Sequence, residues 1–84
     1  MNRNLIKEAG SLPSYVLEMF ANECGVEWVD PNGLLELQAI ILEEIVDKDV
    51  DSTNIFSAFK AVQDSVSRRW NDWLQESVSD AYDV

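Results

Sequence analysis

The stretch VDPNGLLELQAIILEEIVDKDV, residues 29–50, decides the fold of this chain. Asp30 is a residue type that caps helix N-termini, and Pro31 suits the first helical position, where its missing N–H costs nothing. Val29 and Leu34 stand at the spacing of a hydrophobic staple across this start. The polar residues that interrupt the apolar positions beyond it are Glu36, Gln38, Glu43 and Glu44. A helix that is apolar most of the way round is usually the buried central one, so we predict that it forms the spine of the fold.

Two shorter helices are predicted before this spine. Residues 4–9 form a short helix candidate that Gly10 stops. The second helix is expected over residues 13–24, with its proline in the first helical turn, where the missing N–H is tolerated. Gly25 then fits the left-handed residue just past a helix end, and Val26 can fold back as the apolar contact of that cap.

The longest helix is predicted after the spine, over residues 53–76, with Ser52 or Thr53 as its N-cap. Its apolar residues recur at spacings of three and four, which is the period of an amphipathic helix: Ile55, Phe59, Val62, Val66, Trp70, Trp73 and Leu74. Short connections favour antiparallel neighbours. The sequence therefore predicts an all-α fold, a small antiparallel helical bundle of three main helices plus a short N-terminal helix.

Length and charge bound what the chain can do. Eighty-four residues make one domain, expected over residues 1–77, and residues 78–84 form an acidic tail that we expect to fray. The formal net charge of −10 disfavours direct binding to nucleic acid or to an anionic membrane, and it favours a basic or apolar partner. No apolar run approaches the length of a membrane span, so we expect no membrane insertion and a cytoplasmic location.

The absence of histidine excludes several kinds of chemistry. The chain contains no histidine, and Cys24 is its only cysteine. Zinc sites built on His or Cys clusters, Ser-His-Asp triads and Cys-His pairs are therefore all absent. Cys24 lies on the apolar stripe of the second helix and is expected to be a small core residue. We therefore expect neither an enzyme nor a cofactor.

Three aspartates, Asp47, Asp49 and Asp51, stand two apart between apolar segments, as ligands do where a calcium-binding helix–loop–helix begins. An EF-hand loop that started at Asp47 would need glycine at position 6 and a bidentate glutamate at position 12. Those positions hold Ser52 and Ala58. We therefore predict a charged turn between two helices, with Asp51 or Ser52 as a helix cap, and no metal.

The tryptophans are the second notable feature, because tryptophan and arginine are over-represented among residues that carry binding energy at interfaces. Trp70 and Trp73 lie three apart on the apolar face of the long helix, so either both fill the core or at least one is a partly exposed anchor. Trp28 lies in the connector GVEWVD and either packs over the end of the bundle or belongs to an interface. With Arg69, they are the candidate residues for contact with a partner.

Acids cluster near the end of the spine, and an acidic cluster can steer a basic partner towards a binding surface. The candidate steering residues are Glu43, Glu44, Asp47, Asp49 and Asp51.

Together these features favour a small acidic non-enzymatic protein. It would bind and regulate or inhibit another protein through an apolar, Trp-containing surface ringed by acids. One alternative is a nucleic-acid mimic that blocks a DNA- or RNA-binding protein. Another is a structural homo-oligomer, such as a homodimer paired through the long helix. In size, acidity and lack of histidine, the chain resembles the small accessory proteins that phages encode to adjust host enzymes, defence or lysis timing. That resemblance involves no motif.

Overall fold

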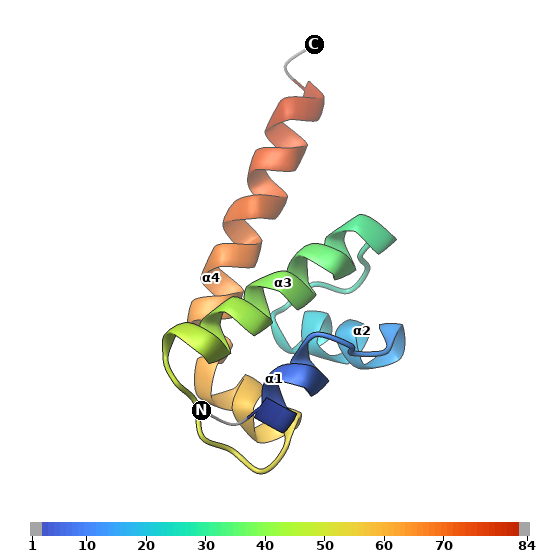
Figure 1. Cartoon of the computed structure of the whole chain (residues 1–84). Coiled ribbons are helices and arrows are strands. Elements are labelled where there is room, and N and C mark those ends of the chain that lie inside the picture. Colours follow the sequence, from blue (N-terminus) through green and yellow to red (C-terminus); the bar gives the residue numbers. More distant parts are fainter. Residues whose placement is uncertain (1–2, 83–84) are drawn as a thin grey trace.

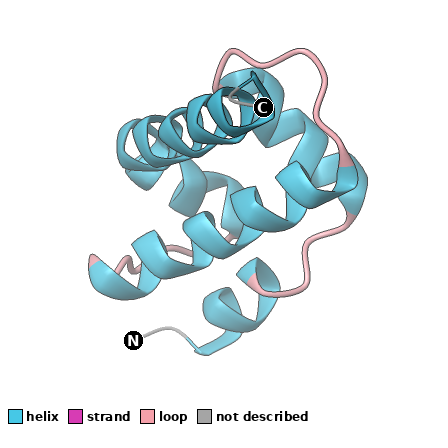
Figure 2. Ribbon diagram, turned by 90° about the horizontal axis from the view of Figure 1, so that it is seen from above, coloured by secondary structure: helices cyan, strands magenta, loops and turns pink. Residues whose placement is uncertain are grey.

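The structure, a computed structural model, describes the backbone of residues 3–82 and the side chains of residues 3–76. This part of the chain consists of helices and loops (Figures 1 and 2): α1 (Arg3–Ala9), α2 (Ser14–Glu23), α3 (Pro31–Asp47) and α4 (Ile55–Tyr82). The all-α prediction, with three main helices and a short N-terminal one, is confirmed. α3 and α4 run in opposite directions and cross obliquely (Figure 1).

α3 is the centre of the fold, because it packs against each of the other three helices. Leu37 and Ile41 are completely buried on it, and Ile40 and Ile45 are nearly so. The predicted spine is therefore confirmed. It is not buried all round, however, because Leu35 on its first turns is 63 % exposed.

α4 is longer than the body that it packs against. Its 28 residues correspond to about 42 Å of helix, which accounts for most of the 44 Å length of the molecule. The first part of α4 buries its apolar stripe in the core, and its C-terminal part projects beyond the other helices (Figure 1). The helix extends past the predicted end at residue 76 and includes the beginning of the expected tail. Residues 83–84 of that tail lie outside the described residues, and its fraying stays a prediction.

α2 begins and ends as short-range rules dictate. Pro13 is the N-cap residue rather than the first helical residue that we predicted, and its extended backbone leads into Ser14. At the other end Gly25 has a φ of 88°, in the left-handed region. The Val26 N–H donates to the Ala21 carbonyl at 3.1 Å, which is the reversed hydrogen bond of a Schellman cap. The predicted cap at Gly25 is confirmed.

The triple-aspartate stretch forms the same kind of cap at the end of α3. Asp49 is the left-handed residue, with a φ of 49°, and the Val50 N–H donates to the Ile45 carbonyl at 3.1 Å. Val50 packs against the core as the apolar contact of this cap. Asp47 is the last residue of α3, so the stretch is a helix-ending turn, as predicted.

The N-cap of α4 differs from the prediction. α4 begins at Ile55, and the Asn54 side chain accepts a hydrogen bond from the Ser57 N–H at 2.9 Å. Asp51, Ser52 and Thr53 were the expected caps, but they precede the helix by too many residues. These three positions belong to the loop between Val50, which packs against the core, and the start of α4.

Candidate protein-docking surface

The structure gives the three tryptophans different surroundings. Trp70 is 0 % exposed and belongs to the core, so it presents no surface to a partner. Trp73 is half-buried and packs against the same core. Trp28 is 80 % exposed and does not pack over the end of the bundle. Among the tryptophans predicted to contact a partner, Trp28 is therefore the one that offers most of its indole to solvent.

Trp28 lies on a connector that is fixed at both ends. The cap at Gly25 sets its beginning, and the Asp30 side chain sets its end by accepting a hydrogen bond from the Gly33 N–H at 2.7 Å. Val29 closes down on the first turn of α3, because a Cβ added at Gly33 would lie 2.3 Å from Val29 Cγ1. Glycine is thus required there by close approach, and the exposed indole is carried by an ordered segment.

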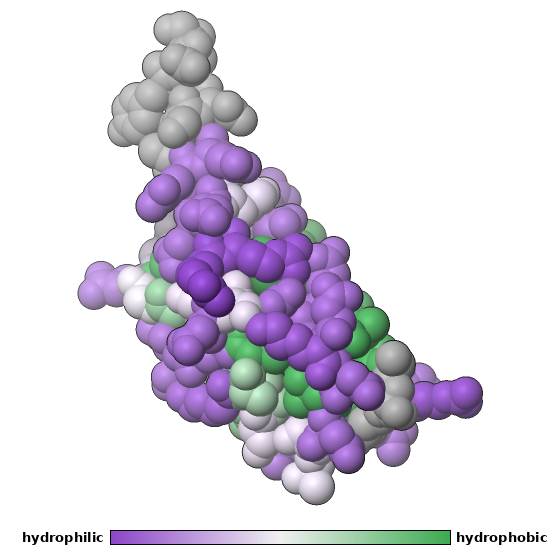
Figure 3. All heavy atoms as spheres, turned by 90° about the vertical axis from the view of Figure 1, so that its left-hand side faces the viewer, coloured by the Kyte–Doolittle hydropathy of each residue, from purple (hydrophilic) through white to green (hydrophobic). Residues whose placement is uncertain are grey.

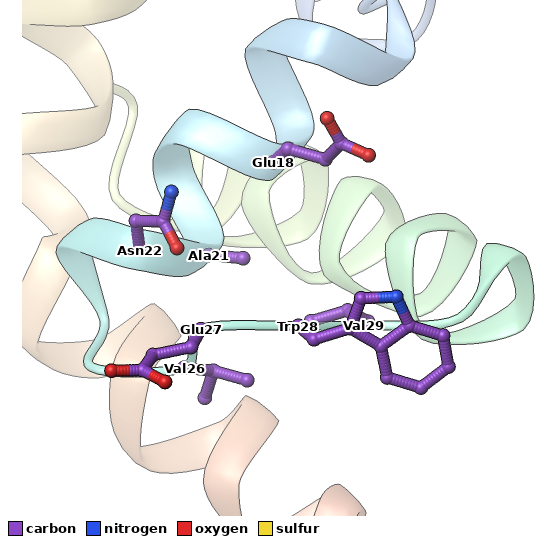
Figure 4. Close-up of a pocket in the computed structure, with 7 residues that line it drawn as sticks. All are labelled: Glu18, Ala21, Asn22, Val26, Glu27, Trp28 and Val29. Carbon is purple, nitrogen blue, oxygen red and sulfur yellow. The ribbon is translucent and has the colours of Figure 1, made fainter.

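Two adjoining hollows flank Trp28, and both are lined by Glu18, Trp28 and Val29. The smaller, of about 270 Å³, lies between α2 and the connector; Figure 4 shows the Trp28 indole and the Glu27 carboxylate extending from the connector in opposite directions. The larger, of about 500 Å³, lies between α2 and the first half of α3. We call Trp28, Leu35 and the residues lining these hollows the Trp28 surface.

The walls of the larger hollow are mainly aliphatic. Leu12 and Leu17 line it from the side of α2, and Leu34 and Leu35 line it from α3. The exposed Leu35 therefore belongs to the same surface as Trp28. An exposed indole beside an exposed leucine and an apolar trough is the kind of contiguous patch that marks an interaction site in soluble proteins.

None of the residues that line the two hollows is basic, and two of them, Glu18 and Glu27, are acidic. No lysine or arginine occurs between Lys7 and Lys48 in the sequence. Asp30 lies between the lining residues Val29 and Pro31. The absence of lysine and arginine from the sequence of both α2 and α3 was the signal that could have drawn attention to the acids of the Trp28 surface.

Arg69, a predicted contact residue, is part of an ion-pair cluster between α3 and α4. Its guanidinium lies 2.5 Å from the Glu43 carboxylate and 3.2 Å from Glu44, which is only 8 % exposed. Lys48 also pairs with Glu44, at 3.6 Å. The hydrogen bond to Glu43 raises the pKa of Arg69 above its ordinary value. This cluster joins two helices of the fold.

The five predicted steering acids lie away from Trp28. Glu43 and Glu44 pair with Arg69, and Asp47, Asp49 and Asp51 are exposed around the C-terminal end of α3. Trp28 precedes the N-terminal end of the same helix, whose 17 residues span about 25 Å. In the part of the chain that the structure describes, no group of three His, Cys, Asp or Glu side chains is arranged to hold a metal ion.

The face formed by α4 and the end of α3 contrasts with the Trp28 surface. Figure 3 shows that this face is mostly hydrophilic, with smaller hydrophobic areas.

A third hollow, of about 220 Å³, lies between α2 and the start of α4, where Phe20 stacks on Phe59 at 4.1 Å. An ion pair between Lys60 and Glu23, 3.0 Å apart, lies at this hollow, so the charge there is balanced.

Cys24 is half-buried at the end of α2, in agreement with a packing role. Burial raises the pKa of its thiol, the nearby Glu23 carboxylate raises it further, and hydrogen bonding to Ser67 partly offsets both effects. A raised pKa keeps the thiol protonated near neutral pH, which is the opposite of what a nucleophilic cysteine needs.

No protein-family model matches this chain, and neither the curated proteins nor the solved structures gave a match. Within residues 3–82, none of the helices has the length and apolar character needed to span a membrane.

Proposed function

We propose that this chain is a non-enzymatic protein that binds another protein through the Trp28 surface and thereby regulates or inhibits it. The observation that carries the proposal is the 80 % exposure of Trp28 on an ordered connector, beside Leu35 at 63 %. Covering such an indole on binding would contribute on the order of 3 kcal/mol of apolar burial before the costs of association. Tryptophan is among the residue types that most often form binding hot spots.

The acids of the Trp28 surface support a partner that carries positive charge. Glu18 and Glu27 line the hollows and no basic residue does, so a basic partner would be attracted and an acidic one repelled. The resemblance to small phage accessory proteins makes a host enzyme, defence protein or lysis factor the expected kind of target.

A nucleic-acid mimic is the second candidate, favoured by the base-free span of sequence between Lys7 and Lys48. Such a mimic would bind a DNA- or RNA-handling protein mainly through its charge, and its affinity would fall steeply with salt. Binding that depends on the Trp28 indole and changes little with salt would favour the protein-docking proposal.

The experiment is affinity capture of partners from an extract of the natural host. The baits are the wild-type protein, Trp28→Ala, and the control Tyr15→Ala, which removes another exposed aromatic side chain, from a position that is not part of the Trp28 surface. We expect Trp28→Ala to lose a partner that wild type and Tyr15→Ala both retain, by about tenfold or more. Circular dichroism confirms that each variant is folded. If a folded Trp28→Ala variant retains every partner, the proposal is wrong.

A further inference from the structure

The two walls of the Trp28 surface are stripes on neighbouring helices. The positions of α2 that line the hollows are Ser14, Leu17, Glu18, Ala21 and Asn22, which recur at three and four residues. The positions of α3 are Pro31, Leu34, Leu35 and Gln38, with the same spacing. A trough between two helical stripes matches the ridge that the apolar face of a third helix presents.

From this geometry we infer that the Trp28 surface binds a basic amphipathic helix of the partner, about two turns of which lie in the trough. The inference rests on the proposed function and specifies the partner chemistry at the same site. The lining residues 31–38 of α3 span roughly 11 Å, which is the length of about two helical turns. On α2, residues 14–18 line the same hollow, and residues 18–22 continue the stripe along the smaller one.

The charges specify the flanks of that helix. Glu18 lines both hollows, and Glu27 lines the smaller one. A helix whose apolar residues at i, i+3, i+4 and i+7 enter the trough would place lysines or arginines at its flanks against these acids. The Trp28 indole would then cover the helix from the side of the connector.

Other occupants fit the described residues less well. A second copy of this chain could offer the projecting part of α4, but that part carries Asp72 and Glu76 and would bring acids against acids. An extended strand would need an open sheet edge, and the described residues contain no strand. A proline-rich segment would need a row of aromatic side chains, whereas Trp28 alone supplies the aromatic contact in these hollows.

Synthetic peptides of about 14 residues test the inference, because shorter helices are marginal in water. The first peptide has leucines on one helical stripe and lysines on both flanks. The second has the same composition with the stripe scrambled, and the third replaces each lysine by glutamate. Binding to the full chain is measured by calorimetry, and the indole N–H signal of Trp28 is followed by NMR after assignment with Trp28→Phe.

We expect the first peptide to bind at least about tenfold more tightly than either control peptide and to shift the Trp28 signal. A double variant, Glu18→Gln and Glu27→Gln, should bind it several-fold more weakly than the wild type. The matched control, Asp72→Asn and Glu76→Gln, changes the net charge equally on α4 and should bind like the wild type. A monomer in sedimentation should accompany these results.

Three outcomes would overturn the inference: equal binding of the scrambled peptide, equal weakening by the two double variants, or self-association that Trp28→Ala abolishes. The first would show that helical order is irrelevant, the second that the attraction is only that of net charge, and the third that the occupant is a second copy. The proposed function fails separately, because it depends on partner capture by wild type and Trp28→Ala. Loss of capture without binding of any peptide would leave the docking surface standing and refute its helical, basic occupant.

Discussion

Trp28 and Trp70 have the same type of side chain, but one lies on an exposed connector and the other lies in the core. Trp70 continues the apolar stripe of α4 and is completely covered as a member of the hydrophobic core. Trp28 lies on a connector whose path is set by Gly25 and Asp30, without help from the indole. The core of this fold is therefore complete without Trp28, which leaves that side chain free for binding.

Replacing Trp70 by alanine tests the larger half of this contrast. We expect Trp70→Ala to lower the free energy of unfolding by about 3–5 kcal/mol, because the change opens a large cavity in the core. Urea denaturation followed by circular dichroism measures the loss. The paired variant Trp28→Ala should stay within about 0.5 kcal/mol of the wild type, as an exposed substitution does.

A domain of this size has so little stability that Trp70→Ala itself can fail to fold. Trp70→Phe then gives a measurable loss of about 1–2 kcal/mol, because it removes less volume. The indole N–H that it also removes has no hydrogen-bond acceptor in the described structure. Equal losses for the Trp28 and Trp70 substitutions would contradict the contrast between the two regions.

Gly33→Ala tests whether the connector is as firmly placed as the structure indicates. The new Cβ would meet Val29 Cγ1 at 2.3 Å, so the connector must shift, at a cost of about 1–3 kcal/mol. The melting temperature reports the loss, and the NMR signal of the Trp28 indole should move with the connector. The control Gly10→Ala adds a Cβ with no neighbour closer than 3.5 Å and should leave both measurements nearly unchanged. If Gly33→Ala changes neither the melting temperature nor the NMR signal of the Trp28 indole, the connector is less firmly placed than the structure indicates.

Arg69→Met tests the ion-pair cluster on the other side of the comparison. Among the described residues, the variant leaves Glu44, which is 8 % exposed, with Lys48 as its remaining ion-pair partner. Because Arg69 is itself 43 % exposed on its side chain, we expect a loss of only about 1–2 kcal/mol. Chemical denaturation of Arg68→Met, an exposed neighbour without such a pair, should show a change within about 0.5 kcal/mol.

Binding of the basic peptide to Arg69→Met completes the test of the ion-pair cluster. Arg69→Met should bind the basic helix as the wild type does, because the Trp28 surface does not include Arg69. Weakened peptide binding in a folded Arg69→Met variant would mean that the two regions act together.

Much of the fold could be predicted from local rules. The caps at Gly25 and Asp30 depend on backbone freedom and on short-range hydrogen bonds, so the residues that form them are visible in the sequence. The predicted N-cap of α4 was wrong because several residues of cap-forming type precede the helix. Which of them becomes the cap depends on where the turn after α3 places the chain, and that residue is Asn54.

The candidate site could be predicted only in part. Trp28 was among the expected contact residues, but Leu35 was hidden within a run of apolar residues that looked uniformly buried. The acids near Trp28 were passed over for the denser cluster from Glu43 to Asp51. Sequence density shows where charge is, but not that Glu43 and Glu44 are paired with an arginine that lies 26 and 25 residues further along the chain.

By itself, the sequence determined that this chain is helical, where most helices end, and that its overall charge is strongly negative, because these properties depend on composition and on neighbours within a few residues. Only the tertiary structure decided which side chains are covered. A period of 3.6 residues identifies the apolar face of a helix, but whether another helix covers that face depends on contacts between distant segments. Those contacts bury Trp70 between helices and leave Trp28, on a connector without periodicity, open to a partner.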